Sequence, residues 1–82
     1  MILVDITVPS VDTTYDFKLD ANTPIGIIVE EITQMICQKE KTTFYGEKER
    51  LLLASYRNKI ILERDKTLKE CGITSGDRLL LV

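Results

Sequence analysis

The sequence predicts an α+β domain in which one amphipathic helix packs against a sheet of five strands. Residues 2–8 and 13–19 each alternate between apolar and polar side chains, which is the period-two pattern of half-buried strands. Residues 24–38 instead place apolar side chains three and four positions apart, as on one face of a helix. The last three strands are predicted from short apolar runs at 51–56, 60–62 and 78–82.

The first two strands are expected to form a β-hairpin, because the turn cluster Pro9–Asp12 is the only link between them. Their side chains on one face are apolar throughout, so this face is expected to meet the helix. The core-facing residues of the hairpin are Ile2, Val4, Ile6, Val8, Tyr15, Phe17 and Leu19.

The helix is predicted to begin at Thr23-Pro24, because a threonine hydroxyl can cap free N–H groups and proline is tolerated at the first helical position. Gly26 and several β-branched residues are poor helix formers, so we expect packing of the apolar face to hold the helix. That face comprises Ile25, Ile28, Val29, Ile32, Met35 and Ile36.

Turns separate the remaining elements. Residues 39–50 are polar and irregular. Asn58 is expected to adopt the left-handed conformation of a tight turn. Thr67 is expected to cap a helical turn that Gly72 ends, and Ser75–Asp77 turns the chain into its last strand.

Composition limits the possible functions. The 82 residues suffice for a single domain, 1–82, and 44% are hydrophobic. The net charge is −2 with both signs interspersed, whereas nucleic-acid binding requires a basic face, so no nucleic-acid partner is expected. No signal peptide and no apolar run of membrane-spanning length is present, so no direct membrane insertion is expected.

No catalytic, cofactor-binding or metal-binding residues are predicted. The chain has no histidine, and its two cysteines, Cys37 and Cys71, form no CxxC pair. We expect two reduced thiols, of which Cys71 packs under a turn as a small hydrophobic residue. A redox-sensitive Cys71 remains the alternative.

Several segments resemble ubiquitin. Residues 62–73, LERDKTLKECGI, are similar to the ubiquitin segment between its fourth and fifth strands, and Glu49–Ala54 looks like its third strand. The resemblance is closer to the bacterial YukD-type ubiquitin-like proteins of type VII (Esx) secretion systems. It rests on Val4–Thr7, Pro24-Ile25 and the closing segment Leu68–Leu79.

The resemblance implies a β-grasp fold, a mixed sheet whose first and last strands are parallel and central. Leu51, Leu53, Leu79 and Leu81 would then join the hairpin residues on the helix-facing side of the sheet. Ubiquitin is attached to its targets through a tail that ends in diglycine, and the printed sequence ends at Val82 without one. We therefore expect this chain not to be conjugated to targets.

Strand alternation predicts a docking or self-association face on the other side of the sheet. Leu3, Leu52, Leu80 and Val82 all point away from the helix in this scheme. The resemblance places the last three at positions like those of the hydrophobic recognition patch of ubiquitin. The alternative is that residues 39–50 or the end of the chain cover these side chains.

The resemblance implies a cytoplasmic, bacterial, non-catalytic module for protein–protein interaction in type VII secretion, as a monomer or weak homodimer. Its protein partners would be the secretion ATPase or membrane channel components. Two alternatives stay open: a modifier or sulfur carrier whose diglycine tail is missing from the sequence, and the N-terminal ubiquitin-like domain of a larger membrane secretion subunit.

Overall fold

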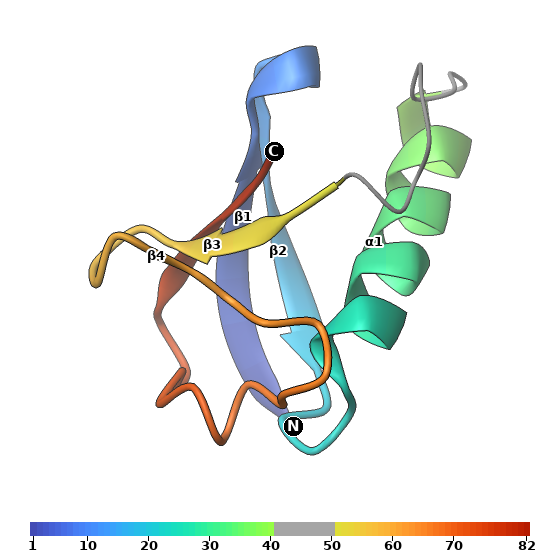
Figure 1. Cartoon of the computed structure of the whole chain (residues 1–82). Coiled ribbons are helices and arrows are strands. Elements are labelled where there is room, and N and C mark those ends of the chain that lie inside the picture. The colour runs from blue at the N-terminus through green and yellow to red at the C-terminus, as the bar shows by residue number, and fades with distance from the viewer. Residues whose placement is uncertain (41–50) are drawn as a thin grey trace.

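A computed structural model describes residues 1–40 and 51–82. Of the predicted connection at 39–50, residues 41–50 therefore lie outside the described residues. The elements are β1 (Ile2–Val8), a 3₁₀ turn η1 (Pro9–Val11), β2 (Thr13–Leu19), α1 (Ile25–Glu40), β3 (Leu53–Ser55), β4 (Ile60–Ile61) and β5 (Arg78–Leu81). The strands form one sheet in the order β2-β1-β5-β3-β4, with α1 against one side (Figure 1). The predicted α+β architecture is confirmed.

The first strand lies inside the sheet and pairs on both of its sides. It pairs antiparallel with β2 over its full length, from Ile2 opposite Leu19 to Val8 opposite Thr13. On its other side it pairs in parallel with β5, where Thr7 lies opposite Leu80. The first and last strands are therefore parallel neighbours, as the resemblance implied.

The third and fourth strands are shorter than the apolar runs that predicted them. β3 pairs antiparallel with β5 and with the two-residue β4. Pairing nevertheless continues past the end of β3, because the N–H of Leu52 donates to the carbonyl of Val82 (2.6 Å) and the N–H of Val82 donates to that of Leu52 (2.8 Å).

The core lies between α1 and the inner face of the sheet. Ile2 and Leu51, both predicted to be in the core, are only partly buried and pack against its margin. Met35 was wrongly assigned to the core, since 45% of its surface is exposed. Thr33 is buried instead, and its hydroxyl donates to the carbonyl of Val29 at 2.7 Å. The buried hydrophobic residues are Val4, Ile6, Val8, Tyr15, Phe17, Leu19, Ile25, Ile28, Val29, Ile32, Ile36, Leu53, Leu62, Leu68, Ile73, Leu79 and Leu81.

The start of α1 differs from the prediction. The hydroxyl of Thr23 makes no hydrogen bond to the helix among the described residues. Distant carbonyls replace it: the N–H of Ile25 donates to Lys66 (2.8 Å) and that of Gly26 to Arg64 (3.0 Å). These bonds satisfy donors that every helix start leaves free, and they tie α1 to the loop after β4.

Of two predicted turn features, the left-handed Asn58 is wrong and the Thr67 cap is confirmed. Lys59, not Asn58, adopts the left-handed conformation at the β3–β4 turn, with φ of 56°. Thr67 does cap its turn: its hydroxyl accepts from the N–H of Glu70 (3.1 Å), and the Glu70 carboxylate accepts from the N–H of Thr67 (3.1 Å). This reciprocal pair is a capping box.

Within residues 1–40 and 51–82, no helix is both long enough and apolar enough to span a bilayer.

Candidate functional site

The outer face of the sheet is the side that α1 does not cover. On β5, Leu79 and Leu81 are buried beneath the helix, so Leu80 between them points outward. On the neighbouring strand, Leu53 is buried, and Leu52 and Ala54 on either side of it point outward. The alternation that predicted these orientations is therefore present in the structure.

Pairing across the sheet brings most of the outward apolar side chains together. Leu80 lies opposite Ala54, and Ala54 lies opposite Ile61 of β4. Leu52 and Val82 pair one step further along the same two strands. Leu52, Ala54, Ile61, Leu80 and Val82 therefore form one contiguous surface, the outward patch.

Leu3 belongs to the same face of the sheet but not to this patch. The parallel register aligns Thr7 of β1 with Leu80, so Leu3 lies four residues further back along its strand, or roughly 13 Å away. Asp5, which is aligned with Arg78, lies between Leu3 and Thr7 on this face. Leu3 is 49% exposed, so it is an apolar surface residue separated from the outward patch by charged side chains.

The sequence did not single out Ile61, which is 59% exposed. The adjacent Leu62 gives the orientation of Ile61. Leu62 is buried, and successive side chains of an extended segment point to opposite faces, so Ile61 points outward. Ile61 lines a hollow of about 530 Å³ whose other walls include Leu80, Tyr56 and Lys59. The hollow therefore lies beside Ala54, Ile61 and Leu80, at the end of the outward patch nearest the β3–β4 turn.

Cations border the hollow at the Arg78 end of β5. The guanidinium of Arg78 lies 5.7 Å from the ring centroid of Tyr56, and Lys59 lines the hollow itself. Both basic side chains, and Arg57 in the same turn, are exposed. The surface thus combines an aliphatic centre with a basic border.

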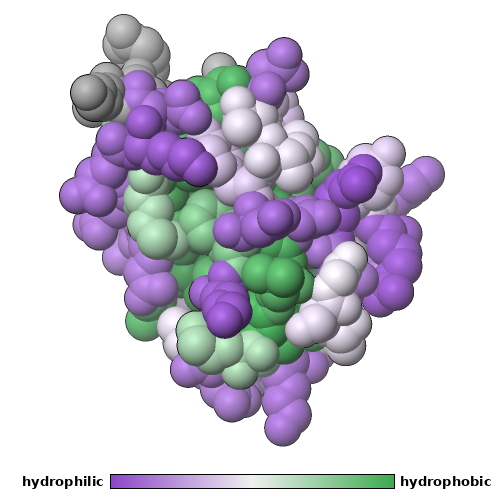
Figure 2. Space-filling view, turned by 180° about the vertical axis from the view of Figure 1, so that it is seen from behind, coloured by the Kyte–Doolittle hydropathy of each residue, from purple (hydrophilic) through white to green (hydrophobic). Residues whose placement is uncertain are grey.

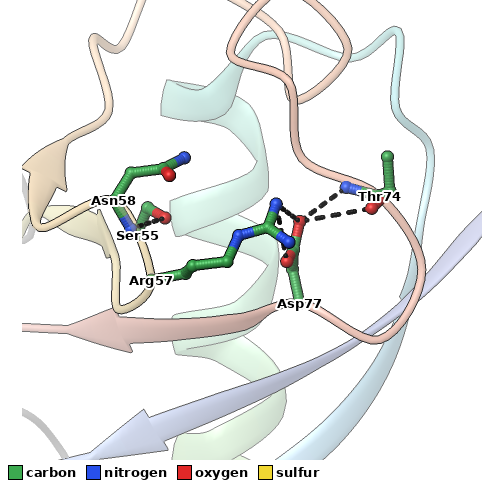
Figure 3. A network of polar contacts seen from close by, with 5 residues as sticks. All are labelled: Ser55, Arg57, Asn58, Thr74 and Asp77. Carbon is green, nitrogen blue, oxygen red and sulfur yellow. Dashed lines mark hydrogen bonds and ion pairs between the residues drawn. The ribbon is translucent and has the colours of Figure 1, made fainter.

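A polar network fixes the β3–β4 turn that carries this border (Figure 3). The nearly buried Asp77 accepts a hydrogen bond from the N–H of Thr74 (2.8 Å) and forms an ion pair with Arg57 (3.2 Å). In the turn itself, the N–H of Asn58 donates to the hydroxyl of Ser55 at 3.2 Å. The network therefore joins the β3–β4 turn to the segment that precedes β5.

The described residues carry three resolved pKa shifts, and none of them resembles an activated catalytic group. Burial raises the pKa of the Cys71 thiol, whereas reactive cysteines require a lowered pKa. A hydrogen bond to the carboxylate of Glu40 raises the pKa of the Tyr15 hydroxyl. Residues 1–40 and 51–82 also contain no group of three or more potential metal ligands.

The third shift belongs to Asp16, which lies directly opposite Asp5 on the antiparallel β1–β2 pair. The hydrogen bond between the two carboxyl groups, followed by the charge of Asp5, raises the pKa of Asp16. Like charges in directly opposite positions destabilise a sheet. This half of the outer face is consequently polar and strained by charge, unlike the outward patch.

The family model that matches the chain is that of protein YukD of the WXG100 protein secretion system (Wss), over residues 3–81. The chain belongs to the YukD family. Comparison with curated protein sequences finds no match.

Solved structures confirm the ubiquitin-like β-grasp fold of this YukD family member. The EccD5 ubiquitin-like domain from Mycobacterium xenopi is 23% identical, with a TM-score of 0.78 over 99% of this chain and 91% of that one. Ubiquitin from Caldiarchaeum subterraneum is 16% identical, with a TM-score of 0.70 over 98% and 89% of the two chains. A ubiquitin-like domain from Arabidopsis thaliana is 20% identical, with a TM-score of 0.72 over 99% and 74%. At these identities the likeness establishes the fold.

Proposed function

We propose that residues 1–82 form a non-catalytic docking module of a WXG100 (type VII) secretion system, and that the outward patch is the docking surface. Membership of the YukD family over residues 3–81 supports the secretion role. The observation that carries the docking role is the contiguous group of outward aliphatic side chains around a hollow of about 530 Å³. Exposed apolar groups of this kind commonly mark interaction sites.

The chemistry of the surface specifies its partner. An aliphatic or aromatic side chain of the partner would enter the hollow beside Leu80 and Ile61. Acidic residues beside that side chain would meet Lys59, Arg57 and Arg78, which raises the association rate and fixes orientation. A cytoplasmic protein of the secretion apparatus, such as its ATPase or a channel subunit, is the partner class we expect.

A capture experiment with the full chain as bait tests the proposal in extracts of the source cells. The wild type should retain WXG100 secretion components. The double variant Ile61→Ser/Val82→Ser should lose them, because both side chains are more than half exposed and their removal alters the surface rather than the core. Leu3→Ser is the matched control, and it should retain the same components.

Two results would contradict the proposal. If the double variant retains secretion components as well as the wild type does, the outward patch is not the docking surface. If the wild type reproducibly retains an unrelated set of proteins, the secretion role is wrong.

A second candidate is a ubiquitin-like domain within a larger membrane secretion subunit. Its support is the EccD5 ubiquitin-like domain, 91% of which is covered by this chain. The mass of the native gene product separates the two candidates, since a free accessory protein runs at 9.4 kDa and a subunit domain at a much larger mass. A product that is conjugated to other proteins would instead appear as a ladder of higher masses.

A further inference from the structure

The sheet has a second exposed feature at the edge opposite β4. β2 is the terminal strand in the order β2-β1-β5-β3-β4, and within the described residues it pairs only with β1. Its seven residues contain no proline. A long edge strand of this kind presents N–H and C=O groups to which another strand can pair.

A groove runs between this edge and the helix. Its volume is about 610 Å³, and its walls include Phe17 and Tyr15 from β2 and Met35, Ile36 and Lys39 from α1. Met35 is the helix residue predicted to be in the core, yet it is 45% exposed at this groove. β2 lies behind β3 in Figure 1, and the reverse view in Figure 2 shows apolar surface among hydrophilic side chains on that side.

We infer that a second copy of this chain occupies the edge, through antiparallel pairing of two β2 strands centred on Phe17. In a two-fold symmetric strand pair, the position of one residue fixes all the others. With Phe17 opposite its own copy, Asp16 lies opposite Lys18 of the second chain, and the same pair occurs again on the other side of the axis. Opposite charges in directly facing positions stabilise a strand pair.

The same register is complementary on the helix-facing side of β2. Phe17 meets Phe17 of the second copy, and Tyr15 meets Leu19, so aromatic and aliphatic side chains face each other. The groove between β2 and α1, including the exposed Met35, would then be covered by the second copy. All five pairs from residue 15 to residue 19 are therefore favourable.

The neighbouring registers lack this complementarity. Centring on Asp16 puts that carboxylate opposite its own copy, next to the Asp5 carboxyl that already faces it. Centring on Lys18 puts lysine opposite lysine and Asp16 opposite Asp20. Centring on Tyr15 places Asp16 opposite Thr14, so it removes the Asp16–Lys18 ion pairs.

The inference goes beyond the proposed function and does not depend on it. β2 and β4 are opposite edges of the sheet, so the pairing would leave the outward patch free on each copy. The resulting dimer would present two docking surfaces on one continuous sheet. A partner with two matching sites would bind such a dimer more tightly than the single chain.

Charge exchange tests the register directly, with sedimentation equilibrium of the full chain as the measurement. Asp16→Lys gives two facing lysines on each side of the axis, and Lys18→Asp gives two facing aspartates. Each variant alone should self-associate at least about tenfold more weakly than the wild type. An equimolar mixture of the two should associate as well as the wild type, because every facing pair is then again of opposite sign.

Glu63→Lys controls for net charge, because it makes the same charge change as Asp16→Lys at an exposed site outside β2. This control should associate like the wild type. Circular dichroism should show that all three variants are folded.

Recovery of association in the mixture, together with its loss in each single variant, supports the pairing. A wild-type chain that remains monomeric at about 1 mM overturns it and leaves the edge to a strand of another protein. Loss of association in both single variants without recovery in the mixture also overturns it, as does association that neither substitution affects.

Discussion

The two faces of β5 show how one strand serves two purposes. Leu79 and Leu81 are buried between the sheet and α1, whereas Leu80 between them lies at the centre of the outward patch. The residues have the same side chain and the same backbone conformation. Only the alternation of the strand decides which of them stabilises the fold and which is available to a partner.

Because of this alternation, so small a domain can combine a stable fold with an apolar surface. Burial of one face of the sheet under a single helix uses alternate residues of β1, β2, β3 and β5. The intervening residues contribute less to folding, so they can vary with the requirements of binding. In this chain they are apolar on β3 and β4 and at Leu80 of β5, and polar on most of β1 and β2.

Removal of an inward side chain should have the largest effect on stability. Leu79→Ala should lower the free energy of unfolding by about 3 kcal/mol, because it leaves a cavity under α1. Urea denaturation followed by circular dichroism measures this loss. A loss below about 1 kcal/mol would show that the core at β5 is loosely packed, contrary to the structure.

Substitutions on the outer face should lower the free energy of unfolding less than Leu79→Ala does. Leu52→Ser/Leu80→Ser should cost about 2 kcal/mol in total, or about 1 kcal/mol per residue, because both side chains are only half-buried. Urea denaturation gives this value, and Leu79→Ala is the reference. If either outward substitution alone costs as much as Leu79→Ala, the outward patch is covered by another part of the chain.

The polar network of the β3–β4 turn should have a smaller effect. Asp77→Ala should cost about 1.5 kcal/mol, because Asp77 is 8% exposed and the N–H of Thr74 loses its acceptor. Arg57→Ala should cost no more than about 0.5 kcal/mol, since the Arg57 side chain is 64% exposed. Thermal melting of both variants checks this order, and equal losses would show that the ion pair outweighs the backbone contact.

The charged half of the outer face should give the smallest effect, with a distinctive pH dependence. Folding raises the pKa of Asp16, so the folded state binds the carboxyl proton more tightly than the unfolded state does. The free energy of unfolding should therefore fall as pH rises from about 3.9 through the raised pKa. Asp16→Asn should therefore melt at a higher temperature than the wild type at neutral pH. The difference should shrink as pH falls below about 3.9, where Asp16 is protonated in the folded chain and its repulsion with Asp5 is relieved.

Asp65→Asn is the control for this substitution, because Asp65 is exposed and lies outside β1 and β2. It should leave the melting temperature almost unchanged across the same range. A gain in Asp16→Asn that is equal at both ends of the range would assign the effect to something other than the facing carboxyl groups.

Long periodic segments were predictable from the sequence. The bounds of β1 and β2 match the predicted 2–8 and 13–19, because seven alternating residues fix both the strand and its buried face. The helix was recognised from its apolar stripe, although the stripe rule wrongly included Met35. A residue at the margin of such a stripe is buried only if another element covers it.

Features that depend on pairing were not predictable. The start of α1 is satisfied by carbonyls of Arg64 and Lys66, which lie far along the chain, so local rules pointed to Thr23 instead. The separation of Leu3 from Leu80 follows from the parallel register of β1 and β5, which alternation cannot supply. Ile61 was missed because two residues are too few to show a period.

The most direct test of the docking surface is a backbone NMR titration of the labelled chain with the secretion component that the capture experiment recovers. We expect amide shifts to change at residues 52–54, at Ile61 and at residues 80–82, with no change around Leu3. Shift changes confined to other parts of the molecule, with the outward patch unaffected, would contradict it.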